Sequence, residues 1–149
     1  MGDRAGWNVQ VTIDSERAHH LADWWAETLG WEVEPQDEAF IRSMIDQGFA
    51  TLDDTETHRG ALVWRGTTAI RPVPGADGPD GPRILFQDVP EGKTVKNRIH
   101  LDLRPPRDLE LDELRSGVEA RGATRIGSGN QGPHHWVVYN DPEGNEFCL

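Results

Sequence analysis

The sequence has little that could form covalent cross-links or place the protein in a membrane. Its one cysteine, Cys148, excludes an internal disulfide framework and suits a reducing compartment, so we expect a cytoplasmic protein. We find no basic-then-apolar leader and no apolar run of membrane-spanning length, so no membrane association is predicted. Basic residues are also few: 15 Lys and Arg against 26 Asp and Glu give a net charge of −11. This charge argues against nucleic acid as a partner.

Tyrosine is scarce as well, whereas tryptophan is not. The chain has one tyrosine and six tryptophans. Tryptophan is mostly buried, but it also lines ligand pockets. A length of 149 residues is enough to bury a real core and predicts one domain or two small modules.

The C-terminal stretch carries the clearest chemical signal. Residues 141–145 combine Asp-Pro and Gly-Asn, which are typical of a turn, and Glu146 then enters a short apolar strand. An unpaired carboxylate in such a strand would be costly to bury. The alternating segment 98–103 puts His100 and Asp102 on one face of a second strand. A His and a Glu on neighbouring strands could share a metal ion or a proton.

Hydrophobic spacing predicts two similar halves, each with a strand, a helix and three strands. The first half adds a helix at about 37–47. Asp14 or Ser15 is expected to cap the first helix, and Gly30 to end it. We expect strands at 7–13, 31–34, 61–64, 67–71, 83–89, 98–103, 123–126, 134–139 and 146–149, with 61–71 as a hairpin, and loops at 53–60, 72–82 and 127–133.

These features together resemble a known superfamily. Paired βαβββ modules, a His early in the second module and the closing segment 141–147 are similar to the vicinal oxygen chelate superfamily, which includes glyoxalase I, bleomycin resistance proteins and extradiol dioxygenases. Segments 86–91, 93–103 and 141–149 most resemble its glyoxalase-like domain branch. The resemblance covers nearly the whole chain.

The resemblance implies an α+β class, the glyoxalase/bleomycin resistance fold. In this fold, two βαβββ modules form paired curved mixed sheets around one concave cavity. It also implies a single glyoxalase-like domain over residues 1–149. Module one would span about 7–90, with the inserted helix at about 37–47, and module two about 97–149.

The resemblance also implies where a metal would bind, because the superfamily takes its ligands from the first and last strand of each module. Gln10, His100 and Glu146 match three such positions. The fourth falls at Leu85, which cannot ligate a metal, and Gln87 shares the face of Leu85. The implied cofactor is a single divalent metal: Zn, Ni, Mn or Fe. The alternative is a metal-free pocket in which His100 and Glu146 hydrogen-bond each other.

The expected catalytic residues are His100 and Glu146, with Glu146 as a general base if burial raises its pKa. The histidines at 19 and 20 are expected on the solvent side of the first helix. Substrate-pocket positions are expected at Gln10, Trp64, His58 and Gln87.

Two function classes follow from the resemblance. The first is a glyoxalase-like small-molecule enzyme, a lyase, isomerase or dioxygenase type, whose metal polarises a substrate oxygen. The second is a metal-free binding protein for a small molecule, resembling bleomycin resistance proteins. In either case the partner is a small molecule. The sequence does not decide whether the protein forms a homodimer.

Overall fold

The computed structural model describes residues 7–73 and 82–149. The chain divides into two compact units, the first ending at Val89 and the second beginning at Pro90. Each unit is described by itself. None of the helices in the described residues is long and apolar enough to cross a membrane.

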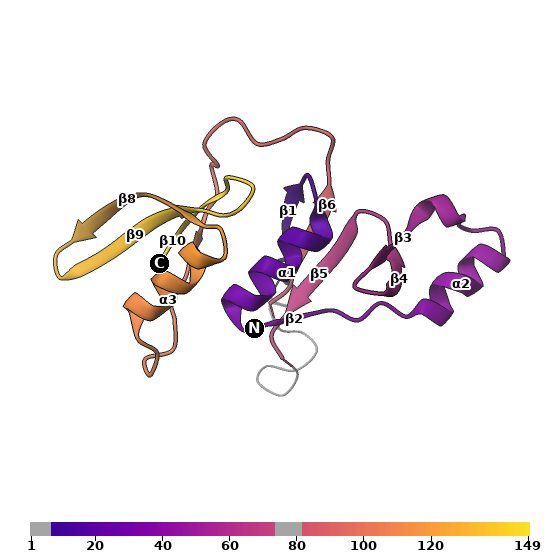
Figure 1. Cartoon of the computed structure of the whole chain (residues 1–149), viewed down its shortest axis with the longest axis horizontal. Helices are drawn as coiled ribbons and strands as arrows, with labels where there is room; N and C mark the ends of the chain where they lie inside the picture. Colours follow the sequence, from indigo (N-terminus) through magenta and orange to yellow (C-terminus); the bar gives the residue numbers. More distant parts are fainter. Residues whose placement is uncertain (1–6, 74–81) are drawn as a thin grey trace, which may run out of the picture. The chain divides into compact units, whose positions relative to one another are not determined.

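The first unit is built on a four-stranded sheet covered by one helix. The strand order is β1-β6-β5-β2, with β1 parallel to β6 and the other pairs antiparallel. Helix α1 packs on one face of this sheet (Figure 1). Its elements are β1 (Val11–Ser15), α1 (Ala18–Leu29), β2 (Glu32–Val33), α2 (Glu38–Asp46), the 3-10 turn η1 (Leu52–Asp54), β3 (Thr55–His58), β4 (Ala61–Trp64), β5 (Thr67–Arg71) and β6 (Ile84–Asp88).

The core of this unit lies between α1 and the sheet. Trp25 of α1 is 1% exposed, and Ile70 and Phe86, which point from the sheet, are 0% exposed. The helix ends where Gly30 adopts φ +65°, a left-handed conformation that favours glycine. The predicted cap was wrong: Arg17 is the N-cap residue, and the Ser15 hydroxyl instead accepts the Arg17 backbone N–H.

An inserted segment, residues 34–66, follows β2 and returns to the sheet at β5. The predicted hairpin at 61–71 was wrong, because β4 pairs with β3 while β5 pairs with β6 and β2. The predicted loop at 53–60 was also wrong, since it contains β3. The Arg65 guanidinium explains part of this arrangement: it donates to the carbonyls of Asp53 and Thr55, which ties the end of β4 to the start of β3.

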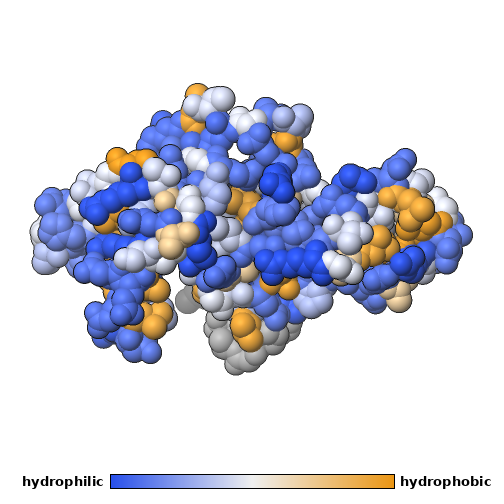
Figure 2. Space-filling model, in the orientation of Figure 1, coloured by the Kyte–Doolittle hydropathy of each residue, from blue (hydrophilic) through white to orange (hydrophobic). Residues whose placement is uncertain are grey.

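Helix α2 of the insertion buries only part of its apolar stripe. Ile41 is 0% exposed, whereas Phe40 is 52% exposed. Phe49 and Leu52, which follow the helix, are also exposed. Figure 2 shows hydrophobic residues on the surface over this part of the chain.

The second unit repeats the sheet of the first with a shorter chain. Its order, β7-β10-β9-β8, places the strands in the same sequence as β1-β6-β5-β2. Tyr139 and Phe147, both 0% exposed, stack at 5.5 Å, and Val118 of the helix is also buried. The elements are β7 (Leu101–Asp102), α3 (Leu111–Ala120), β8 (Thr124–Gln131), β9 (His134–Asn140) and β10 (Glu146–Cys148).

The second unit differs from the sequence expectation at two strands. The predicted loop at 127–133 was wrong, since β8 continues through Gln131 and pairs with β9, with a register shift between Arg125 and Gly127. Strand β7 is shorter than 98–103, and His100 lies just before it. The predicted loop at 72–82 lies largely outside the described residues. The predicted α+β class with two βαβββ modules is confirmed, whereas the assignment of one domain stays a prediction.

Candidate functional site

The face of the second sheet opposite its core carries a cluster of metal-type donors. Phe147 and Tyr139 point into the core, so their strand neighbours point the other way. Cys148 pairs with Asp102 across the parallel strands β10 and β7. One donor atom from each of His100, Asp102 and Cys148 lies within 4.8 Å of the others.

The three groups of this cluster differ in exposure and charge. His100 is 42% exposed, and its Nδ1 lies 3.1 Å from Oδ1 of Asp102. Because a carboxylate accepts, this contact favours the tautomer that donates from Nδ1 and leaves Nε2 with a lone pair. Burial, followed by the nearby Asp102 carboxylate, raises the pKa of the Cys148 thiol. The thiol is therefore protonated at neutral pH unless a metal displaces the proton.

The Glu146 side chain lies on the same face of the sheet, where two other residues of the chain bind its carboxylate. Its side chain is 12% exposed, and its Oε1 lies 3.0 Å from the Lys93 ammonium. Its Oε2 accepts the backbone N–H of Asn97 at 3.0 Å. Burial alone would raise the pKa of Glu146, but these donors outweigh burial and lower it. The condition set for a general base was therefore not met, because the pKa is lowered rather than raised.

The turn before β10 positions this glutamate. Asp141 is 3% exposed, and its Oδ1 accepts the backbone N–H groups of Glu143 and Asn145. The Asn145 side-chain oxygen in turn accepts from the Asn97 amide at 3.1 Å. The turn thus fixes both Glu146 and the segment that carries its donor.

Gln10 and Gln87 lie in the first unit. Gln10 is exposed, precedes β1, and accepts a hydrogen bond from Arg83, which also binds Glu34. Gln87 shares a sheet face with Leu85, as predicted, and lies across from Asp14 in register. Within residues 7–73 and 82–149, Oε1 of Gln87 is buried and has no hydrogen-bond partner.

His58 lies on β3 beside a cavity in the first unit. Its Nε2 is 2.7 Å from Oδ2 of Asp23, which also binds Arg59 at 2.9 Å. His19 stacks on His58 with 5.0 Å between ring centroids. Trp64 contributes its backbone carbonyl, which lies 2.9 Å from His19 Nε2.

His19 was the residue that the sequence reasoning misplaced. It was expected on the solvent side of the first helix but is 5% exposed. The insertion covers a second face of α1, on which His19 and Asp23 are one turn apart. The four-residue spacing of His19 and Asp23 could have indicated that the two side chains lie on one face of the helix.

The predicted site residues are therefore divided between the units. His100 and Glu146 lie on one face in the second unit. The other four lie in the first unit: Gln10, Trp64, His58 and Gln87. Their assignment as ligands, catalytic groups or pocket residues stays a prediction.

Comparison with protein families decides the classification. The sequence model of the glyoxalase-like domain family matches residues 10–149. The chain belongs to this family. The predicted membership of the vicinal oxygen chelate superfamily is confirmed for this glyoxalase-like domain. Comparison with curated proteins gave no match.

Solved structures agree with the fold of this glyoxalase-like domain. A mutant of the fosfomycin resistance protein FosX from Listeria monocytogenes, complexed with Mn(II) and 1S,2S-dihydroxypropylphosphonic acid, has a TM-score of 0.60 at 11% identity; the match covers 97% of this chain and 90% of that chain. FosX from Mesorhizobium loti has a TM-score of 0.57 at 9% identity, with 100% and 91% covered.

A third structure is a glyoxalase/bleomycin resistance protein/dioxygenase family enzyme from Burkholderia phytofirmans PsJN. It has a TM-score of 0.53 at 15% identity, and the match covers 93% of each chain. At these identities the structures show a shared fold.

Proposed function

We propose that this glyoxalase-like domain is a small-molecule enzyme of the vicinal oxygen chelate type that uses one divalent metal. The observation that carries the proposal is the cluster of His100, Asp102 and Cys148 on the open face of β7 and β10. The superfamily takes its ligands from these first and last strands. A structural neighbour complexed with Mn(II) supports the same direction.

The donor set fits a divalent transition metal. Imidazole, carboxylate and thiolate are the side chains that bind Zn, Fe and Ni. His100, Asp102 and Cys148 would each supply one donor atom to the metal. When bound, the metal would polarise a carbonyl or hydroxyl oxygen of the substrate.

Glu146 has a different role in this proposal. Its lowered pKa keeps it ionised at neutral pH, so it holds Lys93 near the face rather than storing a proton. The Lys93 ammonium, 19% exposed, then offers a positive charge to an anionic group of the substrate. Trp136 and Val138 provide apolar surface, since they alternate with the core-facing residues of β9.

The test is metal content measured by mass spectrometry on protein purified without a His tag. We expect about one metal per chain in the wild type and loss of this metal in His100→Ala. His134→Ala is the matched control, because His134 is exposed at the start of β9 and lies outside the cluster. A metal-free wild type, even after soaking with Zn²⁺, Ni²⁺, Mn²⁺ and Fe²⁺, would exclude the metal-dependent mechanism.

The second candidate function is metal-free binding of a small aromatic molecule. It is favoured because two of the predicted metal ligands already bind other side chains: Glu146 is paired with Lys93, and Gln10 with Arg83. Tryptophan fluorescence distinguishes the two functions. Quenching by metal ions supports the enzyme, whereas quenching by aromatic compounds in metal-free protein supports the binding protein. A homodimer, tested by light scattering, remains part of either proposal.

A further inference from the structure

The first unit contains a cavity of about 640 Å³ on the helix-covered side of its sheet. Thr68 of β5 lines the cavity, and it pairs with Phe86 on the face that α1 covers. Leu85 and Gln87, the positions expected in the superfamily's pocket, lie on the opposite face of the sheet. The cavity is therefore separate from the face on which the predicted ligand positions lie.

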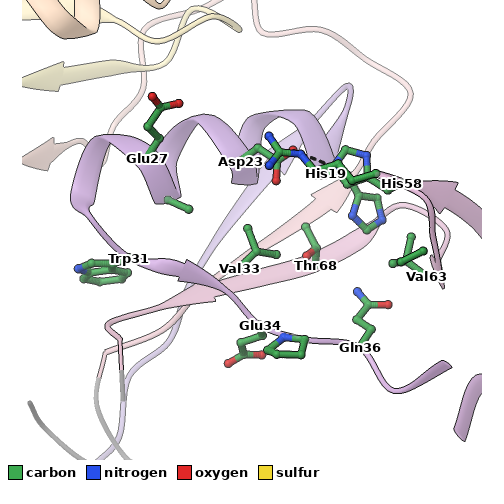
Figure 3. Close-up of a pocket in the computed structure, with 14 residues that line it drawn as sticks. His19, Asp23, Glu27, Trp31, Val33, Glu34, Gln36, His58, Val63 and Thr68 are labelled. Atoms are coloured by element: carbon green, nitrogen blue, oxygen red, sulfur yellow. Dashed lines mark hydrogen bonds and ion pairs between the residues drawn. The ribbon is translucent and has the colours of Figure 1, made fainter. Parts of the chain in front are cut away.

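The insertion supplies one wall of this cavity. His58 of β3 and Val63 of β4 line it together with residues of α1 (Figure 3). In the second unit, β8 and β9 are the counterparts of β2 and β5, and a short turn at residues 132–133 joins them directly. The residues that form this wall therefore have no counterpart in the second unit.

Most charged groups around the cavity are already paired with one another. The Arg83 guanidinium donates from Nε and Nη2 to the two carboxylate oxygens of Glu34, each at 2.8 Å. Oδ2 of Asp23 lies 2.7 Å from His58 Nε2 and 2.9 Å from Arg59 Nε. The charges of these side chains are thus compensated within the protein.

The other two ionisable side chains of the lining are also directed elsewhere. Glu27 is exposed, and its carboxylate points away from the cavity (Figure 3). His19 Nε2 lies 2.9 Å from the Trp64 carbonyl and 3.2 Å from Glu56. A charged ligand would lose its water here without meeting an uncompensated opposite charge, which is costly. The lining therefore favours an uncharged ligand.

Thr68 provides a polar group that is left for such a ligand. It is 4% exposed and lies among the lining side chains (Figure 3). Within residues 7–73 and 82–149, its hydroxyl has no hydrogen-bond partner. The Gln36 amide, in contrast, donates to the Thr67 carbonyl and accepts from the Trp64 backbone N–H. Because a hydroxyl both donates and accepts, Thr68 can bind a hydroxyl or a carbonyl oxygen.

Apolar side chains form the rest of the wall. Trp31, half-buried, lies at the end of the cavity away from His19 and His58 (Figure 3). An indole offers a flat apolar surface against which a ring can stack. The other apolar lining residues come from α1, from the chain after it and from β4: Ala26, Val33, Pro35, Ala61 and Val63. This wall suits a ligand with a planar apolar body.

We propose that this cavity binds an uncharged small molecule with a planar apolar body and one hydroxyl or carbonyl oxygen. The body packs against Trp31 and the apolar wall, and the oxygen forms a hydrogen bond with the Thr68 hydroxyl. A volume of about 640 Å³ is within the usual range for small-molecule sites. The proposal is independent of the metal site in the second unit.

The test is isothermal titration calorimetry of the whole chain at neutral pH with three probes that share one ring system: 2-naphthol, 2-naphthoate and 2-naphthylmethylammonium. We expect saturable binding of the uncharged 2-naphthol, and binding of the anion and of the cation that is weaker by about tenfold or more. The proposal is overturned if 2-naphthol gives no binding heat. It is also overturned if either charged probe binds as tightly as 2-naphthol.

Variants of Thr68 test the hydrogen bond to the ligand. Thr68→Val removes the hydroxyl and keeps the shape, so it should weaken 2-naphthol binding by about two- to tenfold. Thr68→Ser keeps the hydroxyl and should bind 2-naphthol more tightly than Thr68→Val does. Thr57→Val is the control, because Thr57 is exposed on β3 and lies outside the cavity. Equal affinities of wild type and Thr68→Val would overturn the assignment of this hydroxyl to the ligand.

Stability measurements separate a role in binding from a role in folding. Because the Thr68 hydroxyl has no partner within the described residues, Thr68→Val should keep or raise the melting temperature of the ligand-free protein. A lower melting temperature would show that the hydroxyl serves the fold instead. Val63→Trp, which fills the cavity from β4, should keep the fold, checked by circular dichroism, and abolish 2-naphthol binding. Unchanged binding by this variant would overturn the proposal, since the probe would then bind elsewhere.

Discussion

The Lys93 ammonium lies 3.0 Å from Oε1 of Glu146, although the two residues are 53 positions apart in sequence. Lys93 is 19% exposed and Glu146 is 12% exposed, so solvent screens this pair only in part. The contact ties the segment at the start of the second unit to its last strand. Together with the Asn97 backbone N–H, it lowers the pKa of Glu146 and so keeps this carboxylate ionised.

Replacing Lys93 should destabilise the protein and raise the pKa of Glu146. Lys93→Met leaves the backbone N–H groups of Asn97 and of Glu146 itself to offset burial, and we expect a loss of about 1–2 kcal/mol at pH 7. Because the pKa of Glu146 is lowered in the folded protein, its stabilisation is present above the unfolded pKa and lost as pH falls through the folded pKa. Urea unfolding should therefore show a smaller difference between wild type and variant in acid.

Lys96→Met serves as the control for this prediction. Lys96 is exposed, and its hydrogen bond goes to a backbone carbonyl, that of Asn97. Equal losses in the two variants would show that the Lys93–Glu146 pair adds no stability of its own.

The single tyrosine should titrate late. Burial, then the hydrogen bond to Glu119, raises the pKa of Tyr139 to about 12. A raised pKa favours the neutral hydroxyl, so this stabilisation is present below the unfolded value of about 10 and is lost as pH rises through the folded value. Ultraviolet absorbance of tyrosinate follows this one residue, and urea-unfolded chain should titrate near the ordinary value. A folded-state midpoint at the ordinary value would contradict the buried hydrogen bond.

Gly129 should accept no side chain without moving Trp136. A Cβ on Gly129 would lie 2.5 Å from Cζ2 of Trp136, whereas a Cβ on Gly127 would meet nothing within 4 Å. Gly129→Ala should therefore shift the tryptophan emission and cost about 1 kcal/mol or more, while Gly127→Ala changes neither. Emission spectra and denaturant melts of the two variants provide the check. Identical behaviour would mean that the indole does not cover Gly129.

Arg83 should stabilise the first unit only while Glu34 is ionised. The hydrogen bond and charge of Arg83 lower the pKa of Glu34 against the effect of burial. Both side chains are partly exposed, so we expect Arg83→Gln to cost only about 0.5–1 kcal/mol at pH 7. Because the pKa of Glu34 is lowered in the folded protein, the loss should be fully present above the ordinary value of 4.5 and should shrink as pH falls from there through the folded-state pKa. Arg42→Gln, which breaks an exposed pair with Glu38, is the control and should change stability little.

Local patterns predicted the elements that pack against their own sheet. The stripe of α1 and its end at Gly30 follow from helical spacing and glycine chemistry, and both were found. The alternation in 98–103 correctly put His100 and Asp102 together. Cys148 joins them only through the register of β10 against β7, which no local pattern contains.

Other features depended on long-range contacts. Glycines made β8 look like a loop, but Gly129 is required where the Trp136 ring crosses the strand. His19 looked exposed because the periodicity of a helix does not say what covers its second face. The insertion covers this second face because β4 pairs with β3 rather than with β5. Contacts of Arg65 with residues about ten positions away stabilise the pairing of β3 with β4.

The common strand order of the two units has a consequence for how the chain tolerates growth. In the first sheet, residues 34–66 enter between β2 and β5 without interrupting any pairing among its four strands. The equivalent junction in the second sheet is the turn at Gly132 and Pro133. A designed segment inserted into that turn would connect β8 and β9 in the same way that residues 34–66 connect β2 and β5. The turn is therefore the natural position at which to add a new domain to this protein.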